Sequence, residues 1–188
     1  RLVGLPEVPG VVRGGEPGQR LQPLPPGSPR RRGRVLILGF ERHAEALGLA
    51  LPGSALIPSP LTRHLRYARA AGKQILTLID RNITPRQILT RDAFENAIML
   101  HAAIGGSTNG LLHLPVVARE VGVELKLDDF DRIHRRVPVL ANAKTTGRYP
   151  VEYLWYAGGV PAIMLELRDL LHLECMTVTG KTLGENLD

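Results

Sequence analysis

The sequence predicts a helix-rich protein of the α/β class, a partial α/β/α layered domain in which helices pack against short buried strands. Three observations lead to this prediction. Apolar residues recur at helical spacing along most of residues 44–188. Glycine and proline separate the helical stretches at short intervals. Short apolar runs between the helices have the length of buried strands, and the chain has no internal repeat.

Helices in the first half of this region have recognisable starts and stops. Asp92 and Ser107 are the expected N-caps of two of them, because short polar side chains accept the free N–H groups of a first helical turn. Pro115 is expected to bend the helix that follows Ser107 or to end its first turns. The expected ranges are 44–51, 62–80 with a rough apolar stripe, a short turn at 84–90, 92–104 and 107–122.

The second half alternates helices with strand candidates. Asp128 is expected to cap a helix that runs to Val137, and Asp131 lies four residues before Arg135, the spacing of a surface ion pair. Residues 150–171 indicate a helical region interrupted at Gly158-Gly159. The strand candidates are 125–127, 139–142 and 176–179.

Residues 1–43 differ in composition from the rest of the chain. The first 34 hold seven of the 15 prolines, seven of the 20 glycines and seven arginines against two acidic residues. Such a segment buries little apolar surface and is predicted to be disordered. Residues 35–188 carry 17 basic and 16 acidic groups, so the net charge of +6 belongs mainly to the tail. A nucleic-acid partner is therefore not expected.

No run of apolar residues approaches the length of a membrane span, and the first residues lack the apolar core of a secretory signal. The expectation is a cytoplasmic protein without a membrane partner. The single cysteine, Cys175, cannot form an internal disulfide or by itself complete an iron–sulfur site. Asp128, Asp129 and Asp131 are interpreted as helix-start carboxylates rather than as a metal site.

The most specific local feature is Gly105-Gly106-Ser107-Thr108-Asn109. Two glycines permit a tight turn, and three short polar side chains then stand at a helix start, where free N–H groups suit a carboxylate or phosphate. The alternative is a plain helix–turn–helix junction. His101 and His113 flank this turn, and His113 is the stronger candidate to face a pocket. Gly180-Lys181-Thr182 lacks the preceding glycine of a phosphate-binding loop.

Five segments in this order resemble the dihydroxy-acid and 6-phosphogluconate dehydratase family, and the resemblance runs almost unbroken from Ala44 to Asp188. They are EALGLALPGSALIP (45–58), RDAFENAIMLHAAIGGSTNGLLHL (91–114), LDDFDRI (127–133), YAGGVPAIMLEL (156–167) and MTVTGKTLGENL (176–187). The resemblance implies that residues 44–188 are part of the N-terminal domain of such an enzyme, with the family's C-terminal β-barrel domain lying outside this chain.

The resemblance also implies a chemistry. Family members are hydro-lyases, homo-oligomers as a rule, that convert a small-molecule 2,3-dihydroxy acid to a 2-keto acid with an iron–sulfur cluster held by three cysteines, a magnesium ion and a serine base from the barrel. Residues 30–43 contain no cysteine where the third cluster ligand is expected. No catalytic or metal-ligating residue is thus carried over, and no cofactor is expected to bind this chain. Only residues 105–109 and His113 remain as candidate substrate-binding residues.

Two alternatives stay open. The segments 137–159 and 156–167 favour an aldonic sugar acid, such as arabinonate or xylonate, over the dihydroxy acid of branched-chain amino-acid biosynthesis. The other alternative is a truncated, catalytically inactive paralogue that acts as a structural or partner module. For residues 1–43, a frameshifted translation of the cluster-binding region is a further hypothesis, because a GC-rich gene read out of frame yields proline, glycine and arginine.

Overall fold

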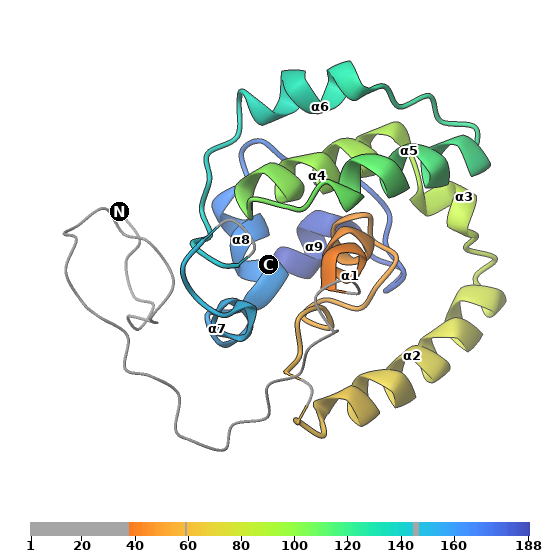
Figure 1. Ribbon diagram of the computed structural model, residues 1–188. Coiled ribbons are helices and arrows are strands. Elements are labelled where there is room, and N and C mark those ends of the chain that lie inside the picture. The colour runs from red at the N-terminus through yellow and green to blue at the C-terminus, as the bar shows by residue number, and fades with distance from the viewer. Residues whose placement is uncertain (1–37, 59, 145–146) are drawn as a thin grey trace.

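The computed structural model describes residues 38–188 except 59, 145 and 146, and within these it is an assembly of helices (Figure 1). None of these helices combines the length and apolar character needed to cross a membrane. The helices are α1 (Leu38–Ala46), α2 (Arg63–Asp80), α3 (Pro85–Ile88), α4 (Arg91–Ala103), α5 (Asn109–Glu120), α6 (Leu127–His134), α7 (Val151–Tyr156), α8 (Gly159–Glu166) and α9 (Leu183–Leu187).

Helix α4 is the centre of the core. Ten of its 13 residues are buried, which fits a helix that is apolar around most of its circumference. It contacts α1, α5, α6 and α8, so elements from both halves of the sequence meet on it. Phe94 of α4 and Phe130 of α6 are almost fully buried and are the largest side chains of this core.

The strands expected from the sequence do not form among the described residues, where strand-like backbone is limited to single bridge residues, as in the bridges Ala143–Tyr149 and Met176–Thr182. The strand part of the α/β expectation is therefore wrong for this region, while its helix-rich part is confirmed. The backbone donors of these segments bond instead to loops and helix ends. Leu140 and Ala141 both donate to the carbonyl of Ala103 at the end of α4.

Three expected N-caps are displaced by one or two residues. Thr90, not Asp92, caps α4, because its backbone is extended and its hydroxyl accepts from the Ala93 N–H at 3.2 Å. Thr108 rather than Ser107 precedes α5, and Lys126 rather than Asp128 precedes α6. Asp92 and Asp128 lie inside the first turns of their helices, where the helix dipole still favours a carboxylate.

The expected boundary at residue 44 also differs from the structure. Helix α1 begins at Leu38, ends at Ala46 and buries Arg42 and His43 against the body. The sequence pattern missed residues 38–43 because the buried side chains there are polar. Residues 38–43 were expected to be disordered and are instead helical. The same expectation for residues 1–37 lies outside the described residues.

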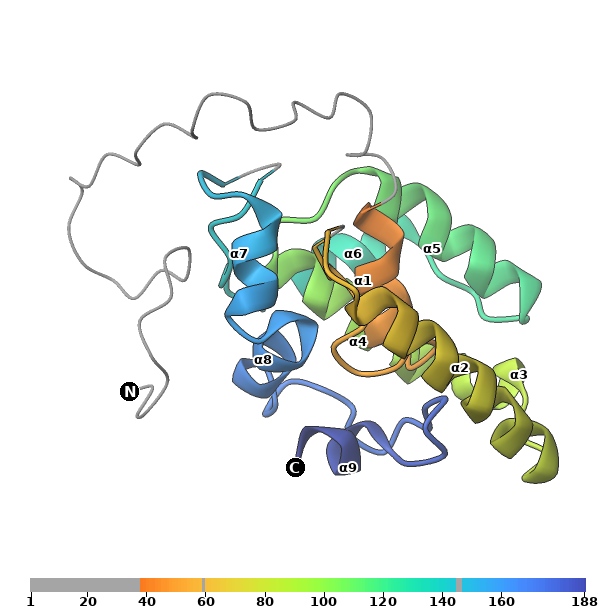
Figure 2. The ribbon, with the colours of Figure 1, turned by 90° about the horizontal axis from the view of Figure 1, so that it is seen from below.

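Helix α2 confirms the predicted range but not a buried stripe, since none of its 18 residues is buried. It runs along the outside of the molecule (Figure 2). Tyr67 attaches its first turns by donating to the Pro52 carbonyl at 3.0 Å. The apolar residues that define the stripe point to solvent, with exposed fractions of 72% for Leu65, 58% for Ile75 and 69% for Ile79.

The exposure of α2 leads to a stability prediction that compares Ile75, which is exposed on α2, with Ile98, which is buried in α4. Ile75→Lys is expected to change the free energy of unfolding by less than about 0.5 kcal/mol, because surface substitutions remove few contacts. Ile98→Lys, at a position with no exposed surface, is expected to prevent folding, because it buries an unpaired charge. Chemical denaturation of both variants checks the contrast, and a large loss in Ile75→Lys would show that the stripe is covered.

Candidate functional site

The turn at residues 105–109 joins the buried end of α4 to the start of α5. Gly105 has φ +60°, a left-handed conformation that favours glycine, and the Gly106 N–H donates to the His101 carbonyl at 2.8 Å. The Gly110 N–H donates to the Ser107 carbonyl at 3.0 Å. The two glycines therefore end one helix and allow the next to start within a few residues, as the sequence predicts.

The three polar side chains of the turn are available for a ligand. Thr108 is exposed and Ser107 and Asn109 are half-buried. Within the described part of the chain, their side chains have no hydrogen-bond partner, and Thr108 does not use its hydroxyl as a cap. They stand at the N-terminus of a 12-residue helix, where free N–H groups favour negative charge. A carboxylate bearing hydroxyl groups suits this arrangement chemically.

His101 lies directly beneath the turn. It is 3% exposed, and its Nε2 is 2.9 Å from the Ser107 carbonyl oxygen. A Cβ added at Gly106 would come within 2.6 Å of Nε2, and one at Gly110 within 2.7 Å of Cδ2. These glycines are thus needed for the close approach of the imidazole as well as for the turn.

A stack of imidazoles continues from His101 on both sides. The ring of His43 in α1 lies 5.3 Å from that of His101, and the ring of His134 in α6 lies 5.1 Å away, measured between centroids. Phe130 meets both His101 and His134 edge to face. Burial lowers the pKa of His101 below its ordinary value, and burial together with the neighbouring His101 lowers the pKa of His134.

Of the two histidines considered from the sequence, the structure places the less favoured one against the turn. His113 is exposed on α5, and its ring meets Phe40 edge to face with 6.0 Å between centroids. Sequence reasoning missed His43 and His134 altogether. Their positions are separated along the chain by tens of residues, and no spacing rule links them to residues 105–109 (the only available signal was their residue type).

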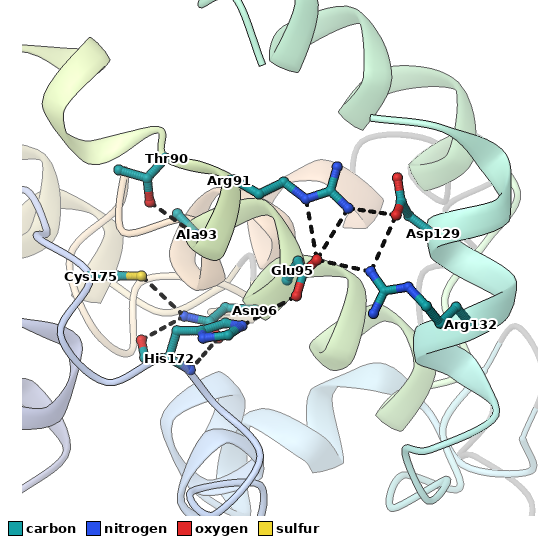
Figure 3. Close-up of polar contacts among 9 residues, drawn as sticks. All are labelled: Thr90, Arg91, Ala93, Glu95, Asn96, Asp129, Arg132, His172 and Cys175. Carbon is teal, nitrogen blue, oxygen red and sulfur yellow. Dashed lines mark hydrogen bonds and ion pairs between the residues drawn. The ribbon is translucent and has the colours of Figure 1, made fainter. Parts of the chain in front are cut away.

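A second polar cluster surrounds Glu95 and Asn96 of α4 (Figure 3). The Asn96 amide donates to the His172 carbonyl at 2.9 Å and to the Cys175 sulfur at 3.6 Å, and the Asn96 carbonyl oxygen accepts from the His172 N–H at 2.8 Å. Asn96 has no exposed surface. These bonds hold the loop at 172–175 to the central helix, so this asparagine has a structural role.

Ion pairs beside Asn96 join α4 to α6. Glu95 accepts from Arg91 and from Arg132, and Asp129 accepts from the same two arginines. The hydrogen bond from Arg91 is the main reason that the pKa of Asp129 falls to about 2. Asp131 pairs with Arg135 at 2.9 Å, which confirms the predicted surface pair. Asp129 and Asp131 are therefore paired with arginines, and Asp128 lies in the first turn of α6.

The buried environment of Cys175 predicts that its thiol reacts slowly in the folded chain. The side chain is buried, and burial raises the pKa of its thiol to about 11, so very little nucleophilic thiolate exists at neutral pH. Iodoacetamide is expected to alkylate Cys175 at least tenfold more slowly in the folded chain at pH 8 than in the chain unfolded by urea. Mass spectrometry of intact protein follows the reaction, and equal rates in the two states would contradict the burial.

Glu45 in α1 is a buried carboxyl group that fastens the loop after the helix. It accepts from the Gly53 N–H at 2.6 Å and from the Ala55 N–H at 2.9 Å. Burial raises the pKa of Glu45 to about 7, although the two hydrogen bonds act in the opposite direction. A small cavity of about 20 Å³ lies beside it, lined also by Thr177 and Asn186. That volume suits a water molecule rather than an organic substrate.

The raised pKa of Glu45 makes the stability depend on pH. Above the ordinary value of 4.5 the unfolded chain releases this proton while the folded chain retains it up to about pH 7, so stability falls as pH rises across that window. The loss attributable to Glu45 is on the order of 3 kcal/mol. Glu45→Gln has no titrating group there, so the wild-type-minus-variant difference from urea denaturation should change between pH 5 and 8, and a constant difference would contradict it.

The residues described do not fit an iron–sulfur cluster or a catalytic metal. Across residues 38–188, gaps excepted, no three histidine, cysteine, aspartate or glutamate side chains gather as a metal site. The one thiol of the chain is held by Asn96 in a buried environment that opposes the thiolate form which metals require. The histidine stack presents imidazole nitrogens to each other and to a carbonyl rather than to a common point.

Comparison with known proteins identifies relatives of this arrangement. Residues 40–186 match the family model of the dihydroxy-acid/6-phosphogluconate dehydratase N-terminal domain. A dihydroxy-acid dehydratase of Acidothermus cellulolyticus is 54% identical over 146 residues, which are 77% of this chain and 26% of that protein. Proteins of the same name from Caldanaerobacter subterraneus and Mycobacterium ulcerans are each 50% identical over similar shares. The chain thus spans about a quarter of the length of these curated relatives.

Proposed function

Because the chain belongs to the dihydroxy-acid/6-phosphogluconate dehydratase family, we propose that it supplies part of the N-terminal domain of a hydro-lyase that converts a 2,3-dihydroxy acid to a 2-keto acid. The observation that carries this proposal is the turn at residues 105–109. It lies within the family match and presents at a helix start three polar side chains that have no hydrogen-bond partner among the residues that the structure describes. In this role the turn binds substrate, and the groups that perform the elimination come from elsewhere in the enzyme.

The proposed substrate is a branched-chain dihydroxy acid. The relatives compared above are named dihydroxy-acid dehydratases, and this supports a dihydroxy acid over the aldonic sugar acids that segments 137–167 favour. The N–H groups at the start of α5 suit the substrate carboxylate. Ser107, Thr108 and Asn109 suit its two hydroxyl groups, because each can donate and accept a hydrogen bond.

A chimeric enzyme tests this function. Residues 40–186 of this chain, the range of the family match, replace the corresponding segment of the Acidothermus cellulolyticus relative, and turnover of 2,3-dihydroxyisovalerate and of arabinonate is measured. We expect turnover of the dihydroxy acid. In the chimera, Asn109→Ala should lower kcat/KM at least tenfold, through a higher KM, a lower kcat or both. The reason is that one well-placed polar contact is worth about 1.4 kcal/mol or more. A folded chimera without activity toward either acid would contradict the proposal.

The matched control is Leu112→Ala, on the exposed face of the same helix one turn later. It should leave kcat/KM within about twofold, because its side chain makes little contact with the protein or the turn. Preference for arabinonate in the chimera would assign the sugar-acid substrate instead.

The chain taken alone is proposed to be inactive, since the described residues do not fit the cofactors that the family chemistry needs. Purified chain treated with iron and sulfide should show no visible cluster absorption and no turnover of either acid. A brown, active preparation would contradict this part of the proposal and would leave the substrate assignment intact.

A further inference from the structure

Two imidazoles and one backbone carbonyl form a continuous line beneath the turn. His134 Nε2 lies 3.2 Å from His101 Nδ1, and His101 Nε2 lies 2.9 Å from the Ser107 carbonyl oxygen. The two ring planes are within 14° of parallel. The line begins at a half-buried residue of α6, passes through the buried His101 of α4 and ends on the turn. It therefore connects a partly accessible group with the backbone of the candidate site.

The hydrogen positions along this line follow from its last member. A carbonyl oxygen only accepts, so His101 Nε2 carries a hydrogen and donates it to Ser107. In the neutral ring the other nitrogen, Nδ1, is then an acceptor. The contact with His134 therefore requires a hydrogen on His134 Nε2, which donates to His101. One carbonyl thus selects the tautomer of two histidines.

The charged and titratable neighbours favour the neutral pair. Arg42 and His43 of α1 face His101, and the arginine charge opposes a proton on that ring. On α6, Asp131 acts on His134 in the opposite sense and favours its charged form. Burial lowers the pKa of both histidines. His101 is buried and lies near Arg42, whereas His134 is half-buried and lies near Asp131, so we expect His134 to take up the first proton as pH falls.

Proton counting predicts two steps with different consequences. A first proton on His134 Nδ1 leaves its Nε2 hydrogen in place, and the bond to His101 remains. A second proton on His101 Nδ1 brings two N–H groups to face each other at 3.2 Å, which is repulsive in place of a hydrogen bond. The pair titrates as a coupled unit. The second step breaks the bond between His134 and His101, while the His101 Nε2 hydrogen stays on the Ser107 carbonyl, so His101 and the turn together lose their attachment to α6.

We propose that His134 and His101 are positioning residues for the turn at 105–109, that they hold it through the Ser107 carbonyl in the order His134 to His101 to Ser107, and that protonation of both rings detaches His101 and the turn from α6. The consequence for substrate binding rests on the function proposed above. The positioning itself concerns the fold of this chain and is measurable without substrate.

Nitrogen-15 NMR of the full chain tests the hydrogen positions directly. At pH 8 the imidazole signals should show hydrogen on Nε2 and none on Nδ1 for both His101 and His134. On acidification His134 should gain its second hydrogen before His101. Exchange protection of the Gly110 amide, which donates to the same Ser107 carbonyl, should persist through the first step and fall in the second. A His101 signal with hydrogen on Nδ1 at pH 8 would overturn the proposal.

Three variants separate hydrogen bonding from packing. His101→Phe keeps an aromatic ring in the stack but has no donor, so Gly110 exchange should accelerate roughly 2- to 10-fold, the worth of one net hydrogen bond. His134→Gln retains a donor but does not titrate, and its amide can turn its oxygen toward a protonated His101. Protection at pH 8 should therefore match the wild type, and the acid-induced loss should disappear. His64→Phe, on exposed α2, removes a histidine that also contacts a carbonyl and should change neither property.

The outcomes distinguish this inference from the proposed function. Unchanged Gly110 protection in His101→Phe, or an acid-induced loss that survives in His134→Gln, would refute the positioning role. If the tautomers and the two-step release are observed and the chimera described above is folded but inactive, the positioning role stands and the proposed function fails.

Discussion

Replacing Gly106 by alanine is expected to destabilise the chain by about 2–4 kcal/mol, because the new methyl group enters space occupied by the His101 ring. The added Cβ would lie 2.6 Å from Nε2 and still closer to Cδ2. The ring cannot move aside cheaply, since it is stacked between His43 and His134 and donates to Ser107. Overpacking of a fixed neighbour typically costs about 1–3 kcal/mol, and loss of the hydrogen bond adds about 1 kcal/mol.

Urea denaturation of a double-mutant cycle isolates this collision. His101→Ala removes the ring, so Gly106→Ala should cost at least about 2 kcal/mol less in that background than in the wild type. Additive effects of the two substitutions would show that the glycine is needed for another reason. Gly72→Ala is the matched control, because no atom lies within 4 Å of its added Cβ in exposed α2. It should stabilise the chain by about 0.5–1 kcal/mol through helix propensity.

Asn96→Ala is expected to cost about 3 kcal/mol, the second large effect. Asn96 is fully buried and makes two bonds to the backbone of His172. Truncation leaves the N–H and the carbonyl of half-buried His172 without their partner. Each orphaned group carries a penalty of roughly 1–3 kcal/mol when buried, reduced where water enters. The free energy of unfolding, measured by urea denaturation, checks the size of the loss.

The thiol of Cys175 reports where the loss occurs. Asn96→Ala should release the loop at 172–175 and accelerate alkylation of Cys175 in the folded state, because the asparagine contacts both residues. Asn96→Leu refills the volume without restoring the bonds and should remain destabilised. If the leucine variant recovers wild-type stability, the cost of the alanine variant comes from a cavity and the hydrogen bonds contribute little.

Local signals in the sequence predicted most helices well. The expected range 62–80 contains α2 (Arg63–Asp80), the expected short turn at 84–90 contains the one-turn helix α3, and Gly158-Gly159 interrupts a helical region. These features depend on neighbouring residues, since glycine, proline and helical periodicity act within one or two turns. The same signals failed for strands, because an apolar run such as 139–142 has no partner strand to bond among the described residues and bonds to the end of α4 instead.

The local sequence pattern also could not predict whether the apolar face of a helix is buried or exposed. The stripe of α2 has helical periodicity, yet nothing among the described residues covers it. Polar residues showed the reverse: His43, Glu45 and Asn96 are buried although their residue types are typical of surfaces. Burial depends on which elements meet in space, and a buried polar group is tolerated where a distant backbone group satisfies it.

By itself the sequence determined the helical character, the turn at residues 105–109 and a family resemblance that the comparison with known proteins confirmed. These follow from residue types and spacings along one stretch of chain. Only the tertiary structure decided that His101 lies beneath that turn, with His43 and His134 on either side. The physical reason is that hydrogen bonds and ring contacts act over a few ångströms in space, and folding alone brings α1, α4 and α6 within that range.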